Sequence, residues 1–260
     1  MATDKFMSPL SERYASSQMQ YIFSQDKKFR TWRKLWIALA EIEQELGISI
    51  TDEQIEELKA HAEDINYEDA RAREKVVRHD VMSHVYAYGL QCPKAKGIIH
   101  LGATSCYVGD NTDIILMRDA LQLVRKKLIN VLAKLADFAD TYKALPTLGF
   151  THFQPAQPTT VGKRATLWMQ AFELALAEVE HAAGSLRLLG SKGTTGTQAS
   201  FLELFDGDMD KVDRLDPMLA EKMGFDRCFS VSGQTYPRLL DTIVVNALAI
   251  TASAAMKMEI

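Results

Sequence analysis

The sequence has 260 residues, of which 47% are hydrophobic and 25% are charged, and its formal net charge is -4. This length and hydrophobic content indicate a folded chain with a sizeable core. The small excess of acids excludes the broadly basic surface that binding to nucleic acid or to an anionic membrane requires.

The first part of the chain predicts three charged helices, over Asp26 to Leu46, Thr51 to Ala62 and Tyr67 to Gly89. The first helix has an apolar face, and the third is mostly solvated. This combination is typical of a small helical domain, which we expect over residues 1–110.

A long helix is predicted from Asn111. Apolar residues recur at alternating steps of three and four from Ile114 to Tyr142, the spacing of one helical face. Pro146 ends this pattern, because proline interrupts a helix.

A second long helix is predicted after Pro158, with Thr159 or Thr160 as its N-cap and Gly190 at its C-terminal end. Because one connection joins two helices of similar length, we expect them to pack antiparallel, as half of a helical bundle.

A third long helix is predicted from near Tyr236. Thr242 to Met256 contains no charged residue, which favours a helix that protein surrounds on all sides. No cap or breaker precedes Ile260, so we expect the natural polypeptide to continue. With almost no alternating strand pattern, the class is all-α: a small N-terminal domain, then an incomplete long-helix bundle over 111–260.

The sequence also bears on the cellular compartment. Cys92, Cys106 and Cys228 are odd in number and lack metal-ligand spacing, which favours a reducing environment. The N-terminal segment has no apolar core of signal-peptide length. We therefore expect a cytoplasmic protein without a bound metal.

The connection between the first two long helices contains the strongest indication of chemistry. It runs from Leu145 to Pro158, whereas helix connections in bundles usually need roughly 2–8 residues. Its prolines favour extended backbone, which would let Thr151, His152 and Gln154 face one small volume. Imidazole groups exchange protons at physiological pH, so His152 is a candidate acid or base. A histidine that only bonds a helix end is an equally good interpretation of the spacing.

Other polar segments interrupt the helices, and each has an ordinary structural explanation. Residues 97–105 offer the hydroxyls of Thr104 and Ser105 to an anion, or form a capping loop. Arg78-His79-Asp80 pairs a cation with an imidazole, or is a surface ion cluster. The glycine-rich segment 190–198 lacks P-loop spacing, which argues against ATP, and forms an anion nest or a flexible connection.

Together and in this order, these segments closely resemble the adenylosuccinate lyase family of the fumarase and aspartase superfamily. The resemblance covers essentially the whole chain. The motifs that carry it are Ser11-Glu12-Arg13-Tyr14-Ala15-Ser16, Arg78-His79-Asp80-Val81-Met82, Leu101-Gly102-Ala103-Thr104-Ser105, Thr151-His152-Phe153-Gln154-Pro155-Ala156-Gln157, Lys192-Gly193-Thr194-Thr195-Gly196-Thr197 and Gly233-Gln234-Thr235-Tyr236.

The resemblance implies a lyase of purine biosynthesis that uses no cofactor. It implies elimination of fumarate from adenylosuccinate, giving AMP, and from succinyl-aminoimidazole-carboxamide ribotide. In the family the residue matching His152 is the general acid that protonates the leaving nitrogen. The implied substrate contacts are Thr151 beside it, Arg13, Tyr14, Arg78, His79 and Asp80 for the nucleotide, Thr104 and Ser105 for the succinyl group, and Gln234.

Two features of the family bear on what this chain does alone. The general base is a serine on a mobile loop that ends in Met-Pro-x-Lys-x-Asn-Pro, and the sequence contains no such stretch. We expect that loop beyond Ile260, and little or no turnover from these residues alone. The family assembles each active site from three subunits of a homotetramer, so the site residues are not expected to meet within one chain.

Two other functions remain open. The bundle pattern alone fits a non-catalytic helical scaffold or oligomerisation fragment, which a natural stop codon after Ile260 would favour. A sister lyase that acts on argininosuccinate, fumarate or aspartate is the other alternative. Arg13-Tyr14 and Arg78-His79-Asp80 favour the nucleotide substrate over that second alternative.

Overall fold

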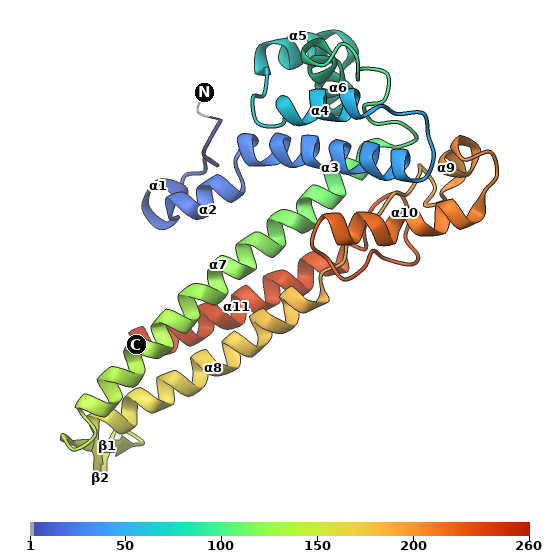
Figure 1. The fold of residues 1–260 in the computed structure, drawn as a ribbon. Coiled ribbons are helices and arrows are strands. Elements are labelled where there is room, and N and C mark those ends of the chain that lie inside the picture. Colours follow the sequence, from blue (N-terminus) through green and yellow to red (C-terminus); the bar gives the residue numbers. More distant parts are fainter. Residues whose placement is uncertain (1–2) are drawn as a thin grey trace. The chain divides into compact units, whose positions relative to one another are not determined.

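The computed structural model describes residues 3–260, without the side chain of Glu12. Its elements (Figure 1) are, in chain order, α1 (Ser11–Tyr14), α2 (Ser17–Ile22), α3 (Gln25–Glu45), α4 (Asp52–Ala60), α5 (Tyr67–Val77), α6 (Asp80–Gln91), α7 (Ser105–Thr141), β1 (Pro146–Thr151), β2 (Gln154–Thr160), α8 (Val161–Ser185), α9 (Ala199–Leu204), α10 (Met209–Lys222) and α11 (Leu239–Glu259). The predicted all-α class is confirmed, with one antiparallel hairpin of β1 and β2 added to it.

The described chain separates into two compact units. The first comprises Met1–Leu116 and Arg187–Arg238, and the second comprises Met117–Leu186 and Leu239–Ile260. Helix α7 contributes residues to both units. The division of the sequence into domains at residue 110 stays a prediction.

Helix α3 provides the core of the first unit. It begins after Ser24, whose hydroxyl accepts the backbone N–H of Lys27, as an N-cap residue does. It contacts α2, α4 and α10. Its large apolar side chains that are only 0–1% exposed are Trp32, Leu35, Trp36, Leu39 and Ile42.

The helix predicted over Tyr67 to Gly89 is two helices, α5 and α6. Arg78 has a left-handed backbone with φ 52°, and His79 is the N-cap of α6, where its side chain accepts the backbone N–H of Met82. An imidazole ring nitrogen therefore takes the capping role that the sequence analysis did not assign to it. This break places Arg78 and His79 at a corner of the backbone.

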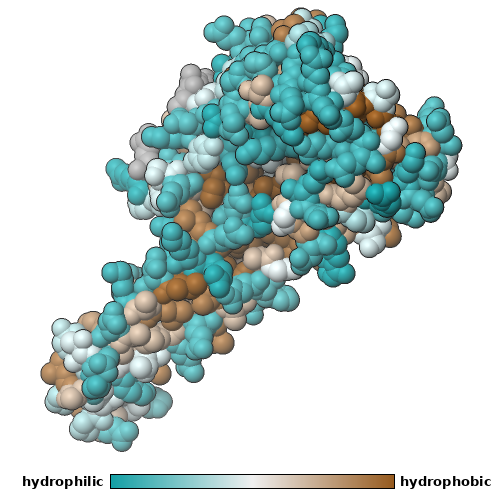
Figure 2. Space-filling model, in the orientation of Figure 1, coloured by the Kyte–Doolittle hydropathy of each residue, from teal (hydrophilic) through white to brown (hydrophobic). Residues whose placement is uncertain are grey.

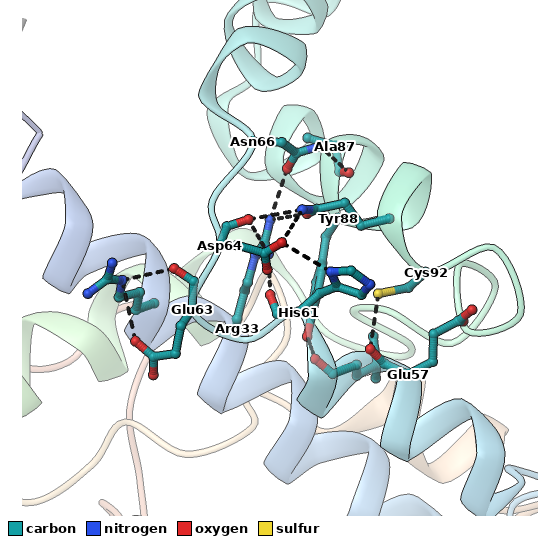
Figure 3. Close-up of polar contacts among 12 residues, drawn as sticks. Arg33, Glu57, His61, Glu63, Asp64, Asn66, Ala87, Tyr88 and Cys92 are labelled. Atoms are coloured by element: carbon teal, nitrogen blue, oxygen red, sulfur yellow. Dashed lines mark hydrogen bonds and ion pairs between the residues drawn. The ribbon is translucent and has the colours of Figure 1, made fainter.

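Arg33 of α3 fastens the segment between α4 and α5 to the rest of the first unit (Figure 3). Its guanidinium donates to the carbonyls of His61 and Asp64 and to the side chains of Asn66 and Gln91. It also lies 4.2 Å from the centre of the Tyr88 ring. A buried charge needs such partners, and three of these four residues lie in the segment between α4 and α5, while Gln91 belongs to α6.

Glu43, also on α3, is a buried ionisable residue that lacks the partners that Arg33 has. Its side chain is 0% exposed, and neither carboxyl oxygen has a hydrogen-bond partner. Burial raises the pKa of this group from 4.5 to about 9, because a buried carboxylate loses its hydration. Glu43 is therefore a neutral acid near pH 7.

This burial makes the stability of the first unit depend on pH. Because the folded pKa of Glu43 lies above the unfolded one, the folded state binds the extra proton, and stability falls as pH rises from about 5 towards 9. Glu43→Gln keeps the shape but never ionises. Between pH 6 and pH 8.5 we expect the wild type to lose stability relative to this variant, by at most about 1.4 kcal/mol per pH unit. Urea unfolding at both pH values measures the difference, and parallel pH dependences would contradict it.

Helix α7 begins at Ser105, six residues before the predicted Asn111, and the prediction of its start was wrong. Asn111 is 0% exposed. Its amide donates to the carbonyl of Gly190 at 3.1 Å and accepts the Gly190 N–H at 3.1 Å. A residue type that favours helix starts is thus used inside the helix to bind another segment.

Helices α7 and α8 are antiparallel within the second unit, as predicted. Arg125 of α7 pairs with Glu180 of α8 at 2.7 Å, and a Cβ on Gly162 at the start of α8 would lie 2.3 Å from the Ala139 carbonyl. Thr160 is the N-cap of α8, also as predicted.

The predicted C-terminal end of the second long helix at Gly190 was wrong, since α8 ends at Ser185. The following backbone pairs with another segment instead: Leu188 forms a parallel bridge with Cys228, and the Phe229 N–H donates to the Leu188 carbonyl at 2.8 Å. Gly190 has φ 86°, as expected of a glycine at a turn, but this turn is no longer helical.

Helix α11 packs along α8. The sequence predicted that protein surrounds this helix on all sides, but the described residues leave part of it exposed. Figure 2 shows apolar surface along the long helices. Exposed apolar side chains of α11 include Val245, Leu248, Ile250 and Met256. The described chain lacks elements to cover them. By length and composition α11 could cross a membrane, but a helix of a soluble bundle meets the same criteria.

Candidate active site

Ser105 and His79 form the first contact between predicted site residues. The Ser105 hydroxyl lies 3.1 Å from Nε2 of His79. Because Nδ1 of His79 accepts the Met82 N–H at 3.3 Å, the ring proton is on Nε2, which donates to Ser105. The proton of Ser105 itself remains available to a ligand.

Thr104, one residue earlier, uses its proton differently. Its hydroxyl donates to the carbonyl of Lys192 at 3.1 Å, so its lone pairs rather than its proton face outward. It lies at the edge of a cavity of about 390 Å³ within the first unit. The cavity is lined by Gly102, Ala103, Thr104, Gly193, Thr194, Thr197, Ala199 and Ser200.

The segment that carries Lys192 is fixed by Asp216 of α10. The Asp216 carboxylate accepts the Ser191 N–H at 2.7 Å and forms an ion pair with the Lys192 ammonium. A Cβ on Gly190 would lie 2.5 Å from the same carboxylate, so glycine is required there. Asp216 was not among the site residues predicted from the sequence.

The segment that contains Gln234 is held through the residues on either side of it. Asp110 of α7, 5% exposed, accepts the Tyr236 N–H at 2.8 Å and pairs with Arg238 at 3.3 Å. A Cβ on Gly196 would lie 2.1 Å from the Ser232 carbonyl. The segment before α11 is therefore fixed both to α7 and to the glycine-rich segment.

The other nucleotide residues expected from the resemblance are exposed. Arg78 and Asp80 flank His79, and the Asp80 carboxylate accepts the Val81 N–H at 2.8 Å. Arg13 and Tyr14 belong to the single turn α1, where the Tyr14 side chain is 76% exposed. No contact in the described part of the chain joins Arg13 or Tyr14 to His79.

His152 occupies the tip of the β1–β2 hairpin, in place of the irregular loop expected from the sequence. Thr151 pairs with Gln154 across the turn, and His152 and Phe153 between them have φ of 50° and 60°. This two-residue turn normally contains asparagine and glycine, so two bulky residues there store strain, as functional sites often do. His152 is exposed, and Phe153 is 100% exposed.

Thr151 lies beside His152 as expected, and it also lines a hollow of about 550 Å³. Gln157, Lys163 and Arg164 are among the other lining residues. Arg164 donates to the Leu148 carbonyl at 2.8 Å, so it holds the hairpin to the start of α8. The hairpin thus has a defined attachment, although its tip is exposed within residues 3–260.

Two further histidines have structural roles. His100 has φ 67°, and its Nδ1 accepts the Trp36 indole N–H at 2.9 Å. His84 stacks on Phe29 with the ring centres 3.8 Å apart. Burial lowers the pKa of both histidines to about 4, so both are neutral near pH 7.

Comparisons with known proteins agree with the family resemblance. The adenylosuccinate lyase of Saccharomyces cerevisiae is 53% identical over 258 residues, which are 98% of this chain and 54% of that protein. The adenylosuccinate lyase of Schizosaccharomyces pombe is 51% identical over 97% of this chain and 53% of that protein. The chain thus spans about half the length of the curated relatives it matches.

Solved structures show the same fold. A fumarate lyase from Mesorhizobium sp. BNC1 superposes with a TM-score of 0.78 at 24% identity, over 94% of this chain and 56% of the other. A 3-carboxy-cis,cis-muconate lactonizing enzyme from Pseudomonas putida gives 0.81 at 21% identity, over 96% and 56%. A family model described as Lyase matches residues 2–204. Because that match covers well over half of the chain, the chain belongs to this lyase family.

Proposed function

We propose that the protein is an adenylosuccinate lyase, which eliminates fumarate from adenylosuccinate to give AMP and also acts on succinyl-aminoimidazole-carboxamide ribotide. The observation that carries this proposal is the 53% identity to the yeast adenylosuccinate lyase over 98% of the chain. The elimination removes a proton beside a carboxylate and breaks a C–N bond.

The side chains match what that reaction requires. Negative charge develops next to an already anionic group, so the site needs hydrogen-bond donors arranged in advance. The free proton of Ser105 is one such donor. The departing nitrogen needs a proton, for which the His152 imidazole is the proposed general acid. Gln234, Arg13, Tyr14, Arg78, His79 and Asp80 are the proposed substrate contacts, with Thr104 and Thr151.

The proposed assembly is a cytoplasmic homotetramer whose subunits share active sites. An exposed general acid would act in open water, where its interactions are weak. His152 is exposed in this chain, and α11 presents apolar side chains such as Val245, 60% exposed. Contact with further subunits would cover both features.

The function is tested on the protein expressed from its full natural reading frame. We expect it to release fumarate and AMP in equal amounts from adenylosuccinate, with the two products followed by chromatography. Fumarate released from argininosuccinate instead would assign the protein to the sister lyases. A folded protein that releases fumarate from neither substrate would favour the scaffold alternative.

A further inference from the structure

The cavity beside Thr104 lacks the charged groups that usually hold a carboxylate. Its lining contains no cation and no acid. The nearby residue Lys192 is 5% exposed, and its ammonium is paired with Asp216. An anion in this cavity must therefore be held by uncharged donors, and it meets no like charge there.

Two of the four hydroxyls that line the cavity already donate to backbone carbonyls. Thr104 donates to the Lys192 carbonyl at 3.1 Å, and Ser200 donates to the Gly102 carbonyl at 2.7 Å. Each hydroxyl has only one proton to donate. Thr194 and Thr197 also line the cavity, and within residues 3–260 neither of their hydroxyls makes a hydrogen bond.

The backbone that carries these two threonines is held in place. The Gly193 N–H donates to the Thr197 carbonyl at 2.7 Å, and the Gly196 N–H donates to the Gly193 carbonyl at 3.1 Å. Gly196, with φ 83°, lies against Ser232 too closely for any side chain. A loop closed in this way presents its hydroxyls with little entropy left to lose on binding.

We propose that Thr194 and Thr197 donate hydrogen bonds to a carboxylate of the substrate, in the cavity that Thr104 also lines. The inference rests on the proposed function for the identity of the substrate. Thr104 is expected to contact the succinyl group. Its hydroxyl already donates to the Lys192 carbonyl, so it can offer that group only lone pairs. The glycine-rich loop supplies the donors that Thr104 does not.

The test uses the full-length protein, with succinate as a dicarboxylate that cannot react. Thr194→Val and Thr197→Val remove the hydroxyl and keep the shape. Each is expected to raise the Kd of succinate and the KM for adenylosuccinate about 10-fold, the effect of losing one hydrogen bond to a charged group. Thr194→Ser and Thr197→Ser should restore both values. Thr195→Val, in the same loop but outside the cavity lining, is the control and should change neither.

The outcomes separate this inference from the proposed function. Valine variants that match Thr195→Val overturn the inference even if the protein is an active lyase, and so does a wild type that does not bind succinate. If adenylosuccinate is not cleaved but succinate binding weakens in both valine variants, the proposed function fails and the carboxylate site stands. Circular dichroism checks that each variant is folded.

Discussion

Replacement of His152 by asparagine is expected to lower kcat of the full-length protein about 10²–10⁴-fold, the usual contribution of a general acid, with KM changed only a few-fold. Asparagine is preferable to alanine, because the backbone at this position has φ 50° and asparagine tolerates the left-handed conformation. The variant therefore removes the proton donor and keeps the turn. Steady-state fumarate release measures both constants.

A matched control is His61→Asn. The His61 side chain lies 3.1 Å from Asp64 on the surface of the first unit, and its backbone carbonyl, which Arg33 binds, is retained in the variant. We expect its kcat to stay within a factor of two of the wild type. Turnover in His152→Asn within tenfold of the wild type would remove His152 from the acid role and leave the proton to another group.

Helices were predictable from the sequence where the hydrophobic period alone decides them. The apolar residues from Ile114 to Tyr142 follow such a period, and α7 ends at Thr141, close to the predicted end. The prediction of helix ends was wrong where a tertiary contact competes with the local preference of the sequence. Asn111 binds the Gly190 backbone rather than capping a helix, and Leu188 pairs with Cys228 rather than extending α8.

The hairpin at His152 was missed for a related reason. Its strands contain Pro155 and Pro158, which weaken a strand pattern, and its turn lacks the asparagine and glycine that signal such hairpins. The extended backbone of Gln154 and Gln157, which the prolines did predict, is confirmed.

The candidate site was predictable as a set of residues but not as an arrangement. The motifs pointed to Thr104 and Ser105, whereas only the structure shows that the Thr104 hydroxyl donates to the Lys192 carbonyl and that the Ser105 hydroxyl lies against Nε2 of His79. Asp216 had a detectable signal. It occupies an i, i+4 position relative to the buried Val212 of α10, and an acid on an apolar helical face needs a buried partner.

The ion pair of Asp216 with Lys192 leads to the second large expected effect, which is on stability. Asp216→Ala leaves the Lys192 ammonium, whose side chain is 6% exposed, without a counter-charge, and it leaves the Ser191 N–H without its acceptor. Removing one member of a buried ion pair costs about 3–5 kcal/mol. We expect a loss of this size in the free energy of unfolding from denaturant titration.

Two further variants determine whether the buried charge is the cause. Asp213→Ala removes an exposed acid from the same helix and should change stability by less than about 0.5 kcal/mol. Adding Lys192→Met to Asp216→Ala removes the stranded ammonium, so the double variant should be more stable than Asp216→Ala alone. If the double variant is less stable than Asp216→Ala, the loss comes from the backbone contact to Ser191 and not from the charge. Because the backbone carbonyl of Lys192 accepts the hydrogen bond from the Thr104 hydroxyl, Asp216→Ala should weaken succinate binding at the adjoining cavity even under conditions where the protein remains folded.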